Sequence, residues 1–230
     1  MTASPRLKVI TEEWPPFNYS ENGEIKGFAT EVMKLVMKEL DVNYKIDILP
    51  ESRGMNTLNK GTRVLFFSFI MTPERKSLYK WIGPIGDQAI HFYKRKDSHL
   101  QIKSLEDAKK VGSICCRNMG LVYTTLKKAG FKNLDVGSNP EGSYLKAIHG
   151  RCDLAIGETD LGVAYWLKKS NYSPSLLEQT PVKVTDSPLY FVVSKDVPDE
   201  EVLRWQQALE KVKSSKEYSK LYKAYREDSK

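Results

Sequence analysis

Cysteine, histidine and long apolar runs are scarce in this sequence of 230 residues. The three cysteines are Cys115, Cys116 and Cys152; their number is odd and two are adjacent, so no disulfide framework is indicated and structural thiols are expected. The three histidines lie far apart, without the spacing of metal ligands, and we predict no metal site. No apolar stretch reaches the roughly 18 residues of a membrane-spanning helix.

Sequence signatures of enzymes are also missing. The chain has no G-x-S-x-G, H-E-x-x-H, P-loop or G-x-G-x-x-G motif, and we expect neither an enzyme nor a cofactor. Its 36 Lys and Arg residues exceed its 29 Asp and Glu residues and give a net charge of +7. These charges are dispersed and form no arginine-rich run interleaved with aromatics, so no nucleic-acid partner is expected.

What the sequence does contain is an alternation of strand-like and helix-like segments. An apolar content of 40% is enough for a folded core. The run "RVLFFSFIM" (63–71) is apolar almost throughout, as in a parallel strand that is covered on both faces. Apolar residues recur at helical spacing over 29–40, between the strand-like segments 7–11 and 44–49. This order predicts an open α/β sheet with helices on both sides.

A second α/β unit follows the extended segment 88–97. It opens with a helix that Ser104 caps, and Asp107 stands at the capping-box position. Two further extended runs after residue 182 and two terminal helices are left over, which indicates that the chain returns to its first unit. We therefore predict two α/β lobes, each an open mainly parallel sheet flanked by helices, joined by a two-strand hinge: lobe 1 has residues 1–92 and 187–230, and lobe 2 has residues 93–186.

The ends of the predicted strands carry the candidate binding residues, because ligands bind at the carboxyl ends of strands in open α/β sheets. Trp14 follows the first strand in a loop that two prolines stiffen, so its indole either packs under a turn or forms a wall for a ligand. Arg75 follows the apolar run. Its guanidinium can hold a carboxylate through paired hydrogen bonds, or it can pair with a surface carboxylate such as Glu74.

Carboxylates stand at a different strand end. The predicted strand 153–158 ends at Glu158, and Asp160 is two residues further on. A cationic rim on one lobe and an anionic rim on the other would suit a zwitterion, of which an amino acid is the simplest.

Several motifs occur in the order found in one protein family: "WPPF", "MTPER" followed by an aromatic and "GP", "GRCDLAIGE", and Lys/Tyr-rich terminal helices. From Leu7 to about Tyr225 the chain resembles the family 3 bacterial extracellular solute-binding proteins of the polar amino-acid type, which serve ABC importers. The resemblance implies a type II periplasmic-binding-protein fold and a periplasmic or extracellular mature form whose leader is absent from this chain. Met1 to Ser4 are expected to be residues added in place of a removed leader. It further implies a monomer whose partners are a small-molecule ligand and the membrane permease of an ABC importer.

The resemblance also implies which residues touch the ligand. Arg75 would grip an α-carboxylate, Trp14 would stack on the ligand, and Glu158 falls where the family usually has an Asp for the ligand ammonium. The "CCRNMG" loop would meet the ligand from lobe 2, with its backbone N–H groups adding to anion binding. The remaining residues of the predicted site are Phe17, Arg53, Ser68, Phe69, Ile70, Thr72, Arg117 and Asn118.

Two departures from the family pattern affect the ammonium site. Glu158 is one methylene longer than the usual Asp, and Ile70 stands where many members have a Ser or Thr. Other small carboxylates therefore stay open as ligands beside an amino acid. Two other function classes stay open as well: the sensor domain of a signalling receptor, and a dehydratase-like enzyme of the same fold with Glu158 or Asp160 as proton donor.

Overall fold

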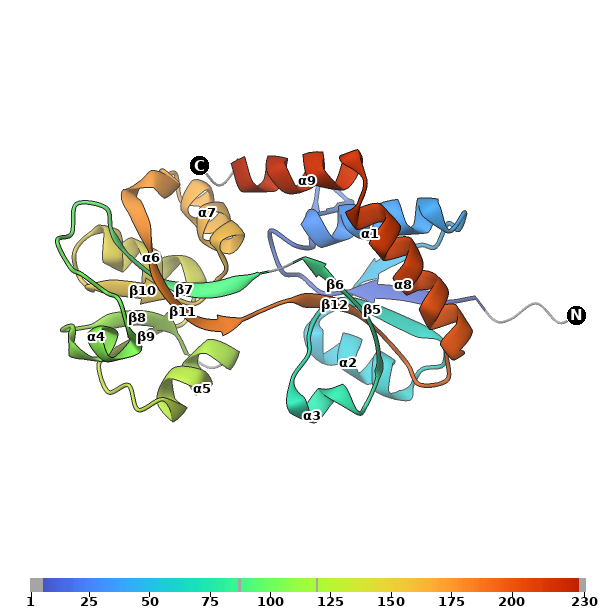
Figure 1. Ribbon diagram of the computed structural model, residues 1–230, viewed down its shortest axis with the longest axis horizontal. Coiled ribbons are helices and arrows are strands. Elements are labelled where there is room, and N and C mark those ends of the chain that lie inside the picture. Colours follow the sequence, from blue (N-terminus) through green and yellow to red (C-terminus); the bar gives the residue numbers. More distant parts are fainter. Residues whose placement is uncertain (1–5, 87, 119, 228–230) are drawn as a thin grey trace, which may run out of the picture. The chain divides into compact units, whose positions relative to one another are not determined.

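The computed structural model describes residues 6–86, 88–118 and 120–227, and Figure 1 shows their ribbon. Contacts between Cα atoms group residues 6–86 and 188–225 into one compact unit, called unit 1, and residues 88–187 into a second, called unit 2. The lobe boundaries expected after residues 92 and 186 stay predictions. Met1 to Ser4 lie outside the described residues. Among the residues that are described, no helix is long and apolar enough to cross a membrane.

Unit 1 is built around a five-stranded sheet whose strands lie in the order β4 (Ile46–Ile48), β1 (Lys8–Thr11), β5 (Val64–Ile70), β12 (Leu189–Val193) and β6 (Lys80–Gly86). β1 pairs in parallel with β4 and with β5, whereas β12 runs antiparallel to β5 and β6. All residues of β5 except the last are buried, which explains its uninterrupted apolar sequence.

The helices of unit 1 are α1 (Phe28–Glu39), α2 (Glu51–Lys60), α3 (Pro73–Lys76), α8 (Asp199–Lys213) and α9 (Lys216–Glu227), and a hairpin of β2 (Tyr19–Glu21) and β3 (Glu24–Lys26) precedes α1. The first N–H groups of α1 donate to the carbonyls of Pro16 and Phe17 at 3.0 and 2.9 Å. These bonds replace a side-chain cap, since the N-cap is Gly27. The loop that carries Trp14 is thereby tied to the start of α1.

Unit 2 has a five-stranded sheet in the order β11 (Leu177–Asp186), β7 (Ala89–Arg95), β10 (Leu154–Ile156), β8 (Ile114–Arg117) and β9 (Leu134–Gly137). The strands β10, β8 and β9 are parallel, and β7 runs antiparallel to both of its neighbours. The helices are α4 (Leu105–Lys110), α5 (Gly120–Lys128), α6 (Pro140–Ile148) and α7 (Asp160–Lys169), with a short 3₁₀ helix at Pro174–Leu176.

Two separate cores cover the two faces of this sheet. Cys116 and Phe92 face α4 and α5, where they pack with Ala108, Val122 and Leu126. The opposite face holds the second core, in which Tyr144 of α6 and Leu167 of α7 are fully buried. Neighbouring residues of a strand thus belong to different layers, as the alternation of side chains along a strand requires.

The predicted fold class is confirmed: the chain has two α/β sheets flanked by helices. Ser104 caps α4 as expected, because its hydroxyl accepts the Asp107 N–H at 3.1 Å. The Asp107 carboxylate accepts the N–H of Lys103, one residue before the cap, at 3.1 Å. Helices α2 and α7 and the hairpin of β2 and β3 were not predicted from the sequence.

The expectation of three structural thiols is wrong. Cys115 and Cys152 form a disulfide with their Cα atoms 5.9 Å apart, and the buried Cys116 is free. Cys115 lies on β8 and Cys152 lies two residues before β10, and these strands are neighbours in the sheet. The pairing therefore depends on the order of strands rather than on spacing in the sequence.

Candidate ligand-binding site

In unit 1, the carboxyl ends of the parallel strands β1 and β5 meet at one edge of the sheet, which we call the β1–β5 edge. Glu12 follows β1 directly, and Thr72 and Arg75 follow β5. Glu51 opens α2, which comes after the neighbouring strand β4. Acidic and basic groups are thus gathered at the edge where open α/β sheets bind ligands.

Ser68 interrupts the pairing of β5 with β12 near this edge. Phe67 pairs with Phe191 and Phe69 pairs with Tyr190, so Ser68 is an extra residue in the ladder, a β-bulge. Its φ of 66° is uncommon for a residue other than glycine. The buried Ser68 hydroxyl has no hydrogen-bond partner among the described residues. Bulges and unsatisfied buried groups of this kind occur next to functional sites.

Arg75 is held in place by its own helix and by an aromatic ring. It lies in the single turn of α3, where the Thr72 hydroxyl accepts its N–H at 3.4 Å. Its guanidinium carbon lies 4.6 Å from the centre of the Phe69 ring, a cation–π contact. Among the residues that the structure describes, Arg75 has no ion-pair partner. The guanidinium is therefore oriented and only half-buried, with hydrogen-bond donors left for an anion.

Glu12 is a functional candidate that the sequence analysis did not single out. Burial, and then the neighbouring negative charge of Glu51, raise the pKa of Glu12 to about 7, and the positive charge of Arg75 lowers it only in part. A carboxylate directly after a central strand was the available sequence signal. The ionised form of such a half-buried carboxylate is stabilised when a cation approaches, which fits a positively charged ligand group.

The Trp14 loop is closed by paired backbone bonds. The Trp14 N–H donates to the Asn18 carbonyl at 2.7 Å, and the Asn18 N–H donates back at 3.0 Å. The indole is half-buried, and its ring centre lies 5.3 Å from that of the buried Phe17 in an edge-to-face arrangement. The Asn18 side chain donates to the carbonyl of Glu12, so this turn also holds the backbone of Glu12. Phe17 supports Trp14 from within the core.

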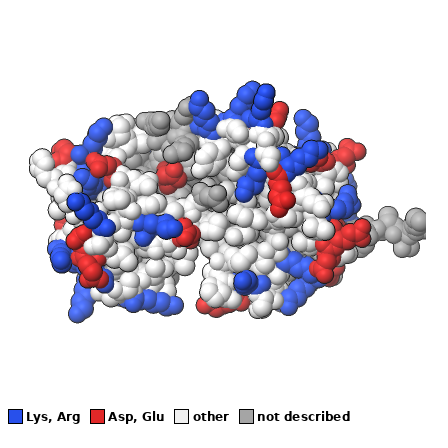
Figure 2. Space-filling model, viewed as in Figure 1, with Lys and Arg blue, Asp and Glu red and all other residues white. Residues whose placement is uncertain are grey.

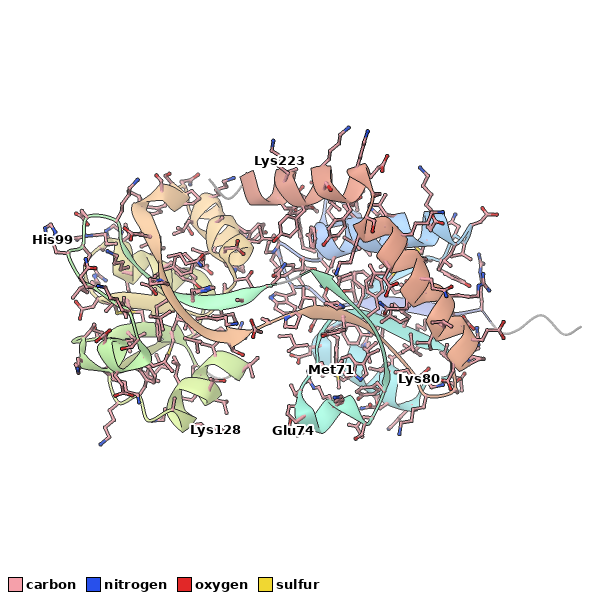
Figure 3. All side chains as sticks on the ribbon, viewed as in Figure 1. Met71, Glu74, Lys80, His99, Lys128 and Lys223 are labelled. Atoms are coloured by element: carbon pink, nitrogen blue, oxygen red, sulfur yellow. A yellow bond between two sulfur atoms is a disulfide. The ribbon has the colours of Figure 1, made fainter. Side chains whose placement is uncertain are left out.

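The other predicted residues of unit 1 differ in their surroundings. Phe69 is buried among Phe66, Tyr79 and Trp81 and acts as the platform under Arg75. Arg53 is exposed on α2, and Ile70 is the half-buried last residue of β5. Met71 and Glu74, labelled in Figure 3, lie on either side of Thr72 and Pro73 at the start of α3. The roles predicted for these residues stay predictions.

In unit 2, the parallel strands β8 and β10 end side by side, and we call this the β8–β10 edge. Arg117 is the exposed last residue of β8, and the N–H of the exposed Asn118 donates to the Gly137 carbonyl at 2.7 Å. Glu158 follows β10 and is buried. Met119, the next residue of the "CCRNMG" loop, lies outside the described residues.

A buried tyrosine places the backbone of Glu158. The Glu158 N–H donates to the hydroxyl of Tyr144 at 2.7 Å, and Tyr144 is fully buried on α6. Burial, followed by the negative charge of Glu158, raises the pKa of the Tyr144 hydroxyl well above its usual value. The tyrosine therefore stays neutral. Like Glu12, Tyr144 was not found from the sequence, because only the packing of α6 brings it to the strand end.

Gly162 on α7 leaves the space that Glu158 occupies. A Cβ atom built on Gly162 would lie 2.8 Å from the Glu158 Cβ and 3.1 Å from its Oε2. We expect Gly162→Ala to lower the free energy of unfolding by about 1–3 kcal/mol, the usual cost of overpacking. Urea unfolding measures this change. Gly137→Ala is the control, because no atom lies within 4 Å of the Cβ position there. Equal stability of the two variants would contradict the assigned packing of Glu158.

The surface charge is mixed rather than gathered by sign. On the face drawn in Figure 2, Lys and Arg side chains are interspersed with Asp and Glu. The net charge of +7 therefore does not mark a nucleic-acid surface on this face.

Comparison with known proteins identifies the family. Residues 7–228 match the model of the bacterial extracellular solute-binding proteins, family 3. The chain belongs to this family. It is 26% identical over 179 residues to the Probable amino-acid-binding protein YxeM of Bacillus subtilis (strain 168). That alignment covers 76% of this chain and 64% of YxeM, so the chain spans less than two thirds of this relative's length.

Solved structures show the same fold for this solute-binding protein. One is the second substrate-binding domain assigned to an amino acid ABC transporter of Streptococcus pneumoniae Canada MDR_19A, with 16% identity, a TM-score of 0.75 and coverage of 95% and 99% of the two chains. Another is a histidine kinase sensor domain similar to periplasmic binding proteins, with 16% identity, a TM-score of 0.74 and coverage of 96% of each chain. The two-lobed periplasmic-binding-protein fold is therefore established for this chain.

Proposed function

We propose that this solute-binding protein captures an amino acid, or another small ligand with a carboxylate, and delivers it to the permease of an ABC importer. The observation that carries the proposal is the β1–β5 edge. It presents an oriented guanidinium without an ion-pair partner among the described residues. It also presents the half-buried Glu12 carboxylate, whose pKa is raised and which interacts electrostatically with Arg75. A ligand with one carboxylate and one cationic group satisfies both. Homology to an amino-acid-binding protein supports this ligand class.

The proposed mechanism is a population shift between an open and a closed form. The ligand carboxylate binds Arg75 in unit 1, and Arg117 or Glu158 of unit 2 then contacts the same ligand. Because a ligand that bridges the lobes binds only the closed form, the difference in affinity drives closure. Closure expels water, which strengthens the charge pairs at the ligand.

The negative charge of Glu12 favours ligands that carry a cationic group in addition to the carboxylate. An amino acid whose side chain is cationic can place its α-carboxylate on Arg75 and a positive charge near Glu12. A dicarboxylate would place a second negative charge there, which the ionised Glu12 carboxylate repels above about pH 7. We therefore expect lysine, arginine or ornithine to bind more tightly than glutamate or aspartate.

A thermal-shift screen of the purified chain tests the proposal. The panel contains the twenty amino acids, ornithine, dicarboxylates, small organic acids and polyamines. A ligand at about 100 times its Kd adds roughly 2.7 kcal/mol of apparent stability. We expect a clear shift with amino acids and the largest with a cationic one. A shift only with carboxylates that lack an amino group would select the second ligand class and exclude a cationic partner for Glu12. No shift with any carboxylate-bearing compound would contradict the proposal.

A second candidate function is that of an input domain in a signalling receptor. The fold is compatible with this role, because a histidine kinase sensor domain has the same fold. The β1–β5 edge would bind the same ligand in both cases. Pull-down of a cognate permease with ligand-loaded protein supports the importer role, whereas a gene that continues into a kinase or cyclase domain supports the sensor role.

A further inference from the structure

A second cluster of chemically active side chains lies away from the β1–β5 edge, in unit 2. It consists of Cys115, Cys152 and Asp135, whose sulfur and carboxylate atoms all lie within 4.8 Å of one another. The Oδ2 atom of Asp135 lies 3.7 Å from the Cys115 sulfur and 3.6 Å from the Cys152 sulfur. The two sulfurs form a disulfide in this structure. The ligand-binding function proposed above uses none of these groups.

The register of the sheet brings the three residues together. Cys115 on β8 is directly opposite Asp135 on the parallel strand β9, so their side chains point to the same face. Cys152 approaches β8 from the other side, where it precedes β10. Cys116 points to the opposite face and packs in the core with α4 and α5, so it cannot join the cluster.

A lysine from the covering helix completes the surroundings of the carboxylate. The Lys146 ammonium of α6 donates to both oxygens of Asp135, at 2.8 and 2.9 Å. Cys115 is fully buried and Cys152 is 4% exposed, whereas the Asp135 side chain is 41% exposed. An ion could therefore reach the sulfurs from solvent along the carboxylate.

We infer that, once the disulfide is reduced, Cys115, Cys152 and Asp135 form a binding site for a thiophilic divalent cation such as Zn²⁺. Zn²⁺ binds sulfur at about 2.3 Å and carboxylate oxygen at about 2.0 Å, so tetrahedral geometry sets sulfur–oxygen distances of roughly 3.5 Å. The observed distances of 3.6 and 3.7 Å are close to this value. Water takes the fourth position.

Only the sulfur–sulfur distance has to change, to roughly 3.8 Å in the same tetrahedron. The Cα atoms of Cys115 and Cys152 are 5.9 Å apart, so rotation of the two side chains is enough to separate the sulfurs. The charges also balance. Two thiolates and the Asp135 carboxylate carry three negative charges, Lys146 neutralises one, and a divalent cation neutralises the remaining two. Lys146 acts as the outer hydrogen-bond partner that fixes the carboxylate.

The chemical step that opens the site needs a dithiol. One dithiol molecule transfers two electrons and two protons to the disulfide, which becomes two thiols while the dithiol closes to its own cyclic disulfide. Binding of the cation then releases the two thiol protons. The oxidised protein lacks the two thiolates, so the disulfide and the metal site are alternative states of the same residues.

Cobalt titration of the reduced chain tests this inference. The protein is reduced with dithiothreitol and desalted without oxygen, and three free thiols are confirmed by a thiol reagent in denaturant. Titration with Co²⁺ is expected to produce sulfur-to-cobalt charge-transfer bands and the visible bands of a tetrahedral site, saturating at one equivalent, and Zn²⁺ is expected to remove them. The oxidised protein is expected to show no bands. Reduced protein without bands would overturn the inference.

Matched variants locate the ligands. Cys152→Ser is expected to abolish the bands and Asp135→Asn to weaken Co²⁺ binding at least tenfold. Cys116→Ser and Asp153→Asn are expected to leave it unchanged, since Cys116 faces the other core and the Asp153 carboxylate, which accepts the Ser113 N–H at 3.1 Å, is not part of the cluster. Bands that persist in Cys152→Ser, or that vanish in Cys116→Ser, would overturn the assignment. If reduction unfolds the chain, Zn²⁺ is expected to restore its circular dichroism spectrum, and a chain that stays unfolded with Zn²⁺ contradicts the inference.

Discussion

Arg75→Ala is expected to lower the affinity for a bound amino acid by about 2–5 kcal/mol, the range found when one partner of a buried charged pair is removed. The reason is that the guanidinium is already oriented by the Phe69 ring and by α3, so the ligand carboxylate binds a preorganised donor pair. Isothermal titration of the wild type and the variant, with the amino acid that gives the largest thermal shift, measures the change.

Two controls separate this effect from a change in surface charge. Lys76→Ala removes a positive charge from the next residue of α3, which is exposed, and is expected to leave the affinity almost unchanged. Arg75→Lys keeps the charge but cannot form paired hydrogen bonds, and we expect an intermediate loss. If Arg75→Ala and Lys76→Ala bind equally well, Arg75 is a surface residue and the proposed carboxylate site is wrong.

Glu12→Gln is expected to change ligand affinity and stability in opposite directions. The ionised carboxylate attracts a cationic ligand group, so the variant should bind L-arginine or L-lysine more weakly. With a pKa of about 7, Glu12 takes up a proton as the pH falls from 8 to 6, and the wild-type affinity for these ligands should fall with it. Titrations at several pH values test this, and Glu12→Gln should lose most of the dependence. The same pH dependence in both proteins would exclude Glu12 as its source.

The stability of the ligand-free protein follows from the same pKa. Because the pKa of Glu12 is raised on folding, its contribution to stability is fully present below about pH 4.5 and is lost as the pH rises through about 7. At pH 8 the wild type therefore keeps an unfavourable, partly desolvated charge that Glu12→Gln lacks. We expect the variant to be more stable there, by on the order of 2–3 kcal/mol. Urea unfolding at pH 8 without ligand measures this, and a destabilised variant would contradict the assigned burial.

The main architecture could be predicted because its signals are local. Strand β5 could be predicted from its own apolar run, and the start of α4 could be predicted from Ser104 and the residues that follow it. Helix α2 was not predicted, because Gly54 in its centre has a low helix propensity. Tertiary packing explains that glycine: a Cβ on Gly54 would lie 2.9 Å from the Phe66 ring.

The parts of the candidate site that could not be predicted depend on pairing between distant segments. The bulge at Ser68 exists because β12, more than a hundred residues later in the sequence, pairs with β5 in a shifted register. The Cys115–Cys152 disulfide joins residues 37 positions apart that only the order of the strands brings together. The pKa of Glu12 is raised by the burial of Glu12 itself and by the negative charge of Glu51. Glu51 comes close to Glu12 only through the position of α2 in the fold.

The central claim is that Arg75 receives the carboxylate of the ligand, and a comparison of two closely related ligands tests it most directly. Isothermal titration would compare the amino acid that gives the largest thermal shift with the amine that lacks only its carboxylate, for example L-arginine with agmatine. A loss of at least 2 kcal/mol corresponds to a Kd about thirtyfold weaker for the amine. We predict this difference between the two ligands for the wild type, and no such difference for Arg75→Ala. Equal affinity of the wild type for both ligands would contradict the account.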